Sequence, residues 1–443
     1  MSFKTMDEAL AFIFSTRHQI QNRGLDEVTR NPEHTRHLLD LASLSDLPIE
    51  YAVVTGSKGK GSVTILTASL LRALSYRVGT ITSPHHKVWF ERIRVDGKMI
   101  PEADFLRILS QLEPFVEAIY QQLPPHQYLS PQGLFLAIAL SWFQEQGVNR
   151  AVLEVGRGGR FDDIAVVPNQ YALFSPIFRE HTQYMGELER IAWHKAGIMK
   201  PDSWAFSLPQ SPPVAEILEE EAQQIGAHLQ FVETAPVHDS IRVTDHGLHF
   251  THPLLGQTEL SLWGDFQVDN ALLALEVVNH WHPQLDQASQ SALKEALAHL
   301  KWYGRLQRLQ ENPAVWVDGA INVLSAQSFL DSILDLTTKP LIIILGVPQD
   351  RDVPAVYELY ARYADVLIIT ETDIHPNIHF PPAAEAHELA RQFHQQVDYF
   401  PNLPQALESA FTQAGTSGTI LLAVAQPLVG EAMLIWDIDV ASL

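Results

Sequence analysis

One short stretch constrains the fold of this chain more than any other. Residues 50–64 read EYAVVTGSKGKGSVT, an apolar run that leads into a loop with three glycines and two lysines. Glycine lets successive backbone N–H groups turn toward one point, and the start of a helix adds partial positive charge there. The stretch therefore predicts a buried strand, a phosphate-binding loop and a helix that begins near Val63.

The loop also supplies the side chains that phosphate and Mg²⁺ require. Lys60 can reach terminal phosphates, and the hydroxyl of Ser62 can face a metal ion. The common spacing G-x-x-x-x-G-K-[ST] is not met, because a glycine lies between Lys60 and Ser62. A flexible turn with solvated lysines is the alternative, but the strand before the loop and the helix after it favour ATP binding. The residues expected to bind the nucleotide here are Gly56, Gly59, Lys60, Gly61 and Ser62.

Apolar runs of strand length alternate with helical patterns along most of the chain. The series from Tyr51 to about Leu300 is typical of βαβ units and of a parallel sheet covered on both faces. A second series follows, with strands expected in AVWVDGA, PLIIILGV, ADVLIITE and GTILLAVA. A chain of 443 residues is too long for one ordinary core. We therefore predict two α/β domains, at residues 1–298 and 299–443, joined by a short hinge near residues 297–303.

Composition narrows the partners and the compartment. Thirty basic against 52 acidic side chains give a net charge of −22, which argues against a nucleic-acid or anionic-membrane surface. No window approaches the ~18 unbroken apolar residues of a membrane helix. The absence of cysteine excludes a catalytic thiol and suits a reducing cytoplasm. The N-terminal stretch contains acidic residues and is interpreted as an amphipathic helix, not a signal peptide. We expect a cytoplasmic monomer that acts on small molecules.

Further polar side chains follow the strand expected in RAVLEVG. Glu154 ends this strand, and the carboxyl ends of parallel strands face the ligand crevice in an open α/β sheet. Its carboxylate could therefore meet the metal ion at the phosphate loop, although an exposed acid at a strand end is the alternative. Arg157 and Arg160, in the adjoining GRGGR, are available for phosphate or carboxylate.

Two more candidates lie in REHTQYMGELERIAWHKAGIMKP. His181 and Lys195 could be ordinary surface groups. However, Lys195 leads into the apolar AGIM, which suggests a partly desolvated amine with a lowered pKa. Such a lysine could act as a nucleophile or accept CO₂ as a carbamate.

Several segments share their order and spacing with one known family. They are TGSKGKGS, TSPHHKVWFERIRVDG, LEVGRGGRFD, EHTQYMG with IAWHKAGIMKP, WYGRLQ and VDGAIN. Together they resemble the folylpolyglutamate synthase and dihydrofolate synthase family, a branch of the Mur ligases, over nearly the whole chain. The resemblance implies an ATP-dependent amide ligase with an N-terminal P-loop domain, whose sheet is rich in parallel strands, and a smaller C-terminal Rossmann-like domain. The two domains would close over a shared cleft.

The resemblance also implies roles for individual residues, with ATP and Mg²⁺ as the ligands. Those matched to metal binding are Ser62, Ser83, Glu154, His181 and Lys195, those matched to nucleotide contacts are Asn270 and Arg305, and those matched to catalysis are Lys60, His181, Lys195 and Asp318. Lys195 would be the lysine that the family carbamylates to reach a second Mg²⁺ bound by His181. The implied reaction turns a dihydropteroate or folate carboxylate into an acyl phosphate, which the amine of L-glutamate then attacks.

The sequence also departs from the family pattern. SKG replaces TNG in the loop and adds Lys58, and GGRFDDIA replaces GGRLDATN, so that Ile164 and Ala165 stand for threonine and asparagine. Ile321 replaces the histidine of DGAHN, which removes an imidazole that can hydrogen-bond and titrate near neutral pH. Three hypotheses stay open: a ligase that adds glutamate to a pteroate or folate, a ligase of the same fold with another acid and amine, and a nucleotide-binding protein without turnover.

Overall fold

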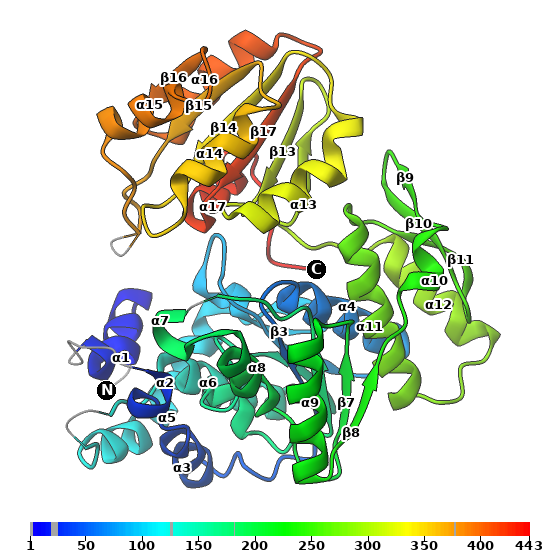
Figure 1. Cartoon of the computed structure of the whole chain (residues 1–443). Coiled ribbons are helices and arrows are strands. Elements are labelled where there is room, and N and C mark those ends of the chain that lie inside the picture. Colours follow the sequence, from blue (N-terminus) through cyan, green and yellow to red (C-terminus); the bar gives the residue numbers. More distant parts are fainter. Residues whose placement is uncertain (1–2, 19–24, 125–126, 181, 376–377) are drawn as a thin grey trace.

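The computed structural model describes residues 3–18, 25–124, 127–180, 182–375 and 378–443 (Figure 1). These residues form two α/β domains, each built on a sheet rich in parallel strands with helices on both faces, as predicted. In this part of the chain, no helix is long and apolar enough to cross a membrane.

The larger, N-terminal domain is built on an eight-stranded sheet. Its strands are β1 (Glu50–Thr55), β2 (Val78–Ile81), β3 (Ile93–Val95), β4 (Lys98–Met99), β5 (Arg150–Glu154), β6 (Tyr171–Phe174), β7 (Trp204–Ser207) and β8 (His228–Phe231). The order is β4-β3-β2-β5-β1-β6-β7-β8, with β3 and β4 antiparallel at one edge and the other strands parallel. The predicted strand before the phosphate loop is therefore central, with β5 and β6 as its neighbours.

Helices cover both faces of this sheet. The helices of this domain are α1 (Met6–His18), α2 (Asp26–Thr29), α3 (Glu33–Leu41), α4 (Lys60–Ala73), α5 (Glu102–Tyr120), α6 (Pro131–Glu145), α7 (Thr182–Met185), α8 (Leu188–Ala196), α9 (Pro212–Ile225), α10 (Ala235–His238), α11 (Asp265–Trp281) and α12 (Gln287–Ala298). Successive side chains of a strand point to opposite faces. Tyr51 and Val53 of β1 accordingly pack in the core that contains α5 and α6, whereas Ala52 and Val54 pack in the core that contains α4 and α11. Burial on both faces explains the continuous apolar run before the loop.

A small antiparallel sheet interrupts the βαβ rhythm expected up to about residue 300. Its strands are β9 (Arg242–Thr244), β10 (Gly247–His252) and β11 (Gly256–Leu260), each antiparallel to the next along the chain. The connections between them are too short for the crossover that parallel neighbours need. The predicted sheet rich in parallel strands is present, and this small antiparallel sheet is an additional element that the sequence patterns did not indicate.

The smaller, C-terminal domain is built on a six-stranded sheet of order β12-β13-β17-β14-β15-β16. Its strands are β12 (Gln307–Gln310), β13 (Ala314–Asp318), β14 (Leu341–Gly346), β15 (Val366–Thr370), β16 (Val397–Phe400) and β17 (Thr419–Val424), and its helices are α13 (Val323–Ile333), α14 (Val353–Ala361), α15 (Ala383–Arg391), α16 (Leu403–Ala414) and α17 (Gln426–Ile435). The four strands expected from the sequence are β13, β14, β15 and β17. The less apolar β12 and β16 form the edges, and β12 is antiparallel to β13.

The chain passes between the two domains twice. The first crossing is the segment between α12 and β12, and the second is the C-terminal tail, residues 438–443, which ends beside the larger domain (Figure 1). Arg94 donates from Nη2 to the carbonyl of Val440 at 2.7 Å, and Leu443 N donates to Gly97 O at 3.1 Å. The tail therefore ties the two domains together in addition to the segment between α12 and β12.

We expect Arg94→Met to release this tail. The Arg94 side chain is buried and donates to the carbonyls of Val440 and Ala441, so its loss leaves Val440 O without this donor, whereas Ala441 O keeps the bond from Met99 N. Amide hydrogen exchange at residues 440–443 should rise, and the free energy of unfolding should fall by about 1–3 kcal/mol. Arg77→Met is the matched control, since Arg77 is about half exposed. Unchanged exchange in the Arg94 variant would contradict this role.

Candidate active site

The phosphate loop, residues 56–62, connects the carboxyl end of β1 to α4. The helix begins at Lys60, earlier than predicted, with Gly59 as its N-cap residue at φ 84°. A Cβ atom at position 59 would lie 2.8 Å from Asn270 Oδ1 of α11. Both the left-handed backbone and this close approach require glycine here. The predicted nucleotide residue Asn270 is thus in contact with the loop.

Two lysines converge on one carbonyl at the start of the loop. Lys60 Nζ donates to Gly56 O at 3.0 Å, and Lys195 Nζ of α8 donates to the same oxygen at 2.7 Å. Lys195 also forms an ion pair with Glu180 at 2.9 Å. Burial lowers the pKa of Lys195 to about 8, and the charge of Glu180 opposes this shift. The desolvated amine that the sequence suggests at Lys195 is therefore present.

A buried carboxylate lies beside the loop. Glu154 Oε2, at the end of β5, accepts a hydrogen bond from Ser83 N at 2.8 Å. The same oxygen would lie 3.5 Å from a Cβ atom at Gly61. Burial raises the pKa of Glu154 to about 6, although the Lys60 charge acts against the rise. The structure thus brings Glu154 and Ser83 to the loop, and it excludes the alternative that Glu154 is an exposed acid.

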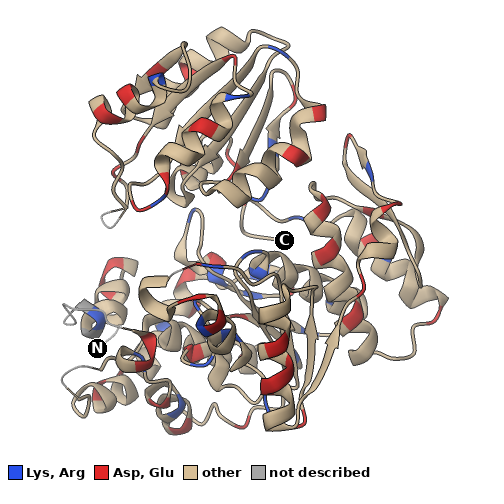
Figure 2. Ribbon diagram, viewed as in Figure 1, with Lys and Arg blue, Asp and Glu red and all other residues tan. Residues whose placement is uncertain are grey.

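The C-terminal domain contributes one acidic and one positively charged side chain to the same region. Asp318, at the end of β13, accepts from Leu306 N at 2.7 Å, and burial raises the pKa of this carboxyl group. The Arg305 charge acts against the raised pKa values of both Asp318 and Glu154, so Arg305 lies near the acids of both domains. Figure 2 shows basic residues along the side of the larger domain that faces the smaller one, whereas α9 carries four glutamates and no basic residue. A local basic region therefore exists in spite of the net charge of −22.

The oxygen donors at the loop fit Mg²⁺. Glu154 supplies a carboxylate and Ser62 and Ser83 supply hydroxyl groups, and Mg²⁺ prefers oxygen ligands shared with phosphate and water. No group of three or more His, Asp or Glu side chains that could hold a metal ion occurs among the described residues. A metal ion here would thus depend on phosphate oxygens as additional ligands. His181, the predicted ligand of a second ion, lies outside the described residues.

Arg157 and Arg160, expected from the sequence to be available for anions, are both ion-paired within the protein. Arg157 pairs with Asp26 of α2, and Arg160 Nη2 lies 2.6 Å from Glu221 Oε2 of α9. The expectation that these side chains are free for phosphate or carboxylate is therefore wrong in this structure. The sequence could not indicate these ion pairs, because the two acidic partners lie far from the arginines along the chain.

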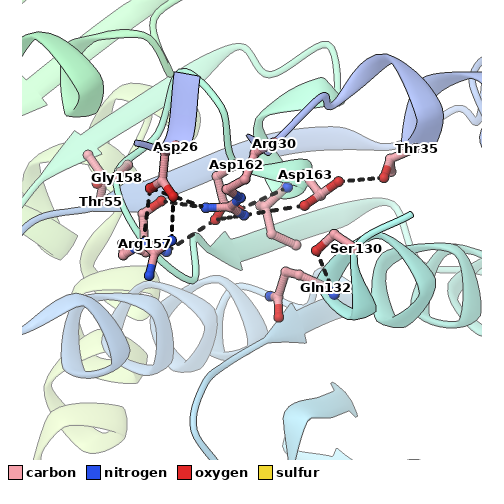
Figure 3. Close-up of polar contacts among 11 residues, drawn as sticks. Asp26, Arg30, Thr35, Thr55, Ser130, Gln132, Arg157, Gly158, Asp162 and Asp163 are labelled. Atoms are coloured by element: carbon pink, nitrogen blue, oxygen red, sulfur yellow. Dashed lines mark hydrogen bonds and ion pairs between the residues drawn. The ribbon is translucent and has the colours of Figure 1, made fainter. Parts of the chain in front are cut away.

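Figure 3 shows a buried polar cluster, a few residues beyond Glu154, that sequence reasoning did not identify. Arg30 Nη2 lies 3.0 Å from Asp162 Oδ2 and 3.3 Å from Asp163 Oδ2, and Thr35 Oγ1 donates to Asp163 Oδ1 at 2.6 Å. Burial opposes the charge of Arg30, yet the three neighbouring aspartates raise its pKa. The cluster ties the N-terminal helices α2 and α3 to the loop that follows β5.

Sequence reasoning also missed residues that shape the phosphate loop. Ser175, which directly follows β6, donates from Oγ to the carbonyl of Lys58 at 2.5 Å. Trp302 lies against Gly61, where a Cβ atom would be 2.9 Å from its ring. Trp302 belongs to the quoted segment WYGRLQ, so a signal for it was present. Ser175 is a single serine after a strand, and no sequence pattern marks it as part of the site.

A cavity of about 860 Å³ lies elsewhere in the larger domain. Its lining includes Tyr51, Tyr171 and Trp204, which lie at the amino ends of β1, β6 and β7, and also Lys200. These residues mark the amino ends of the strands, the opposite edge of the sheet from the phosphate loop. In a parallel sheet the ligand crevice lies at the carboxyl ends, so we place the active site at the loop.

Comparisons with known proteins agree with this geometry. The model of the Mur ligase middle domain matches residues 54–278, and that of the Mur ligase glutamate ligase domain matches residues 304–425. The chain is therefore a Mur ligase, an ATP-dependent ligase. A dihydrofolate synthase/folylpolyglutamate synthase of Mycobacterium tuberculosis is 30% identical over 390 residues, which is 83% of this chain and 79% of that protein. The chain belongs to the folylpolyglutamate synthase and dihydrofolate synthase family.

A further relative and a solved structure support the same family assignment. A folylpolyglutamate synthase of Lacticaseibacillus casei is 26% identical over 77% of this chain and 82% of its own length. A crystal structure of Mycobacterium tuberculosis folylpolyglutamate synthase complexed with ADP and AMPPCP superimposes with a TM-score of 0.82 at 26% identity. It covers 97% of this chain and 99% of that one.

Proposed function

We propose that this enzyme uses ATP to activate the carboxylate of a folate or of dihydropteroate and joins it to the amine of L-glutamate. The observation that carries the proposal is the set of groups at the carboxyl edge of the large sheet, where Lys60, Glu154 and Ser83 lie at the phosphate loop. Asp318 and Arg305 reach the same region from the C-terminal domain. The names of the relatives supply the substrate class.

The chain's residues have separate tasks in this reaction. The backbone N–H groups at the start of α4 and the Lys60 ammonium bind the phosphates of ATP. A carboxylate oxygen of the acid then attacks the γ-phosphorus and releases ADP, which leaves an acyl phosphate. The glutamate amine attacks the acyl carbon, phosphate leaves, and the amine loses a proton. Asp318 is our candidate for orienting the amine, and Arg305 and Asn270 for contacting the nucleotide.

Mg²⁺ would be held by Glu154, Ser62 and Ser83 together with phosphate oxygens, and it would neutralise charge on the phosphates. We propose His181 as a ligand of a second ion and a carbamate on Lys195 as its partner. The lowered pKa of Lys195 supports this assignment, because only the neutral amine adds CO₂. We also propose a boundary between the two domains at residues 298 and 299, where α12 ends.

The test is phosphate release from ATP with Mg²⁺ and each combination of acid and amine. We expect release only when glutamate is present together with dihydropteroate or tetrahydrofolate, and the product should be heavier than the acid by one glutamyl residue. No turnover with either acid would overturn the proposal. The same assay identifies the acid substrate, because dihydropteroate and tetrahydrofolate are tested in separate reactions.

A ligase with another acid and amine is the second candidate. It is favoured by Ile321, which packs against the core of the C-terminal domain and offers no side-chain hydrogen bond. A screen of acids and amines with ATP separates the two, because only the second candidate predicts turnover without a folate. Tight ATP binding without turnover in every combination would indicate a nucleotide-binding protein instead.

A further inference from the structure

The side chain of Lys58 projects from a part of the phosphate loop whose backbone is held by several hydrogen bonds. Its carbonyl accepts from Ser175 Oγ, and the preceding Ser57 donates from Oγ to Phe178 O at 2.9 Å and accepts from Phe178 N at 3.0 Å. Ser57 N also donates to Pro176 O at 2.8 Å. The segment after β6 therefore fixes the apex of the loop, and the position from which the Lys58 side chain starts is defined.

The surroundings of Lys58 are rich in cations. Burial is the main cause that lowers the pKa of Lys58, followed by the charge of Arg305, and Lys60 acts in the same direction. Asp318 and Glu180 oppose these effects. Arg305 and Asp318 belong to the C-terminal domain, so the ammonium group lies on the side of the loop that this domain faces.

Lys58 is not committed to a partner in the part of the chain that the structure describes. The residue reaches solvent although neighbouring protein atoms partly desolvate its ammonium group, and neither a hydrogen bond nor an ion pair of that group is found there. Lys60, by contrast, already donates to Gly56 O at the foot of the loop. A second lysine held among cations without a paired acid is a site for an added anion.

We propose that Lys58 is a second phosphate-contact lysine, which binds the terminal phosphate of the nucleotide from the side of the C-terminal domain. The inference rests on the proposed ATP site and adds to it a residue that distinguishes ATP from ADP. A bound triphosphate would give the Lys58 ammonium its counter-charge and would link the loop to the domain that carries Arg305 and Asp318. Lys60, at the foot of the loop, would serve both nucleotides.

Equilibrium titration with ATP and with ADP, each with Mg²⁺ and without acid or amine, tests the inference. For Lys58→Gln we expect the Kd for ATP to rise about 10- to 100-fold, the loss expected for one charge-assisted hydrogen bond, and the Kd for ADP to change less than about twofold. Lys58→Arg should keep most of the preference for ATP. Lys339→Gln is the matched control, because this exposed lysine of the C-terminal domain pairs with Asp365.

Two results would overturn the role of Lys58. Equal weakening of ATP and ADP would show that the side chain supports the loop, and unchanged affinity for both would show a solvated lysine. If the unaltered protein bound neither nucleotide, the proposed function itself would fail before Lys58 was tested. Circular dichroism of each variant confirms that the fold is retained.

Discussion

Arg30→Ala should lower the free energy of unfolding by about 3–5 kcal/mol near neutral pH. Arg30 lies between Asp162 and Asp163, and both carboxylates are buried (Figure 3). Removal of one partner from a buried ion pair leaves charge without compensation in a medium of low dielectric constant. Arg36→Ala is the matched control on the adjacent helix, where Arg36 and Glu33 are 48% and 67% exposed. We expect it to cost less than about 1 kcal/mol.

The pH dependence makes this prediction sharper. Without Arg30, burial should hold the pKa of Asp163 above its unfolded value, because burial already raises this pKa in the unaltered protein. An acid whose pKa is higher in the folded protein than in the unfolded chain makes the free energy of unfolding fall as pH rises. The difference from the unaltered protein should therefore be smaller near pH 5 than near pH 8, measured by urea denaturation. A cost below about 1 kcal/mol, or one independent of pH, would contradict our account of the cluster.

Lys195→Met should lower the rate of glutamate ligation by at least about 100-fold, an effect typical of losing one preorganised charged group at a reacting centre. The ammonium group holds Gly56 O and pairs with Glu180, so its loss disturbs the first residue of the phosphate loop and leaves Glu180 without this partner. A carbamate at this position would be lost as well. Steady-state phosphate release with saturating substrates measures the effect.

Lys200→Met is the control for Lys195. Burial also lowers the pKa of Lys200 to about 8, and its Nζ donates to Ala165 O at 2.7 Å, but it lies at the opposite edge of the sheet. We expect turnover within a few-fold of the unaltered protein. Comparable losses in the two variants would mean that Lys195 acts through folding stability alone.

The parts of the fold that were predictable depend on local patterns. Continuous Val, Ile and Leu runs mark strands buried on both faces, as β1 and β14 show, and the glycines after β1 mark the loop. Parallel strands place their carboxyl ends at one edge, which is why Glu154 could be assigned to the loop from the sequence. The family was recognised from the order of its motifs, and the comparisons confirm it.

The remaining features depend on contacts between residues far apart in the chain. Arg30 precedes Asp162 by 132 residues, and Arg94 precedes Val440 by 346 residues, so no local pattern indicates either contact. The same reason explains why Arg157 and Arg160 looked available for anions, since their partners lie on α2 and α9. The roles of the individual site residues remain predictions that the variants above can test.

The most direct test of the account is a calorimetric titration of the intact protein with ATP and Mg²⁺, in parallel with Lys60→Ala. We predict saturable binding of one nucleotide per chain, and a Kd at least about tenfold higher in the variant, because a charge-assisted contact to phosphate is lost. Absence of binding by the unaltered protein, or equal affinity in the variant, would contradict the assignment of the phosphate loop.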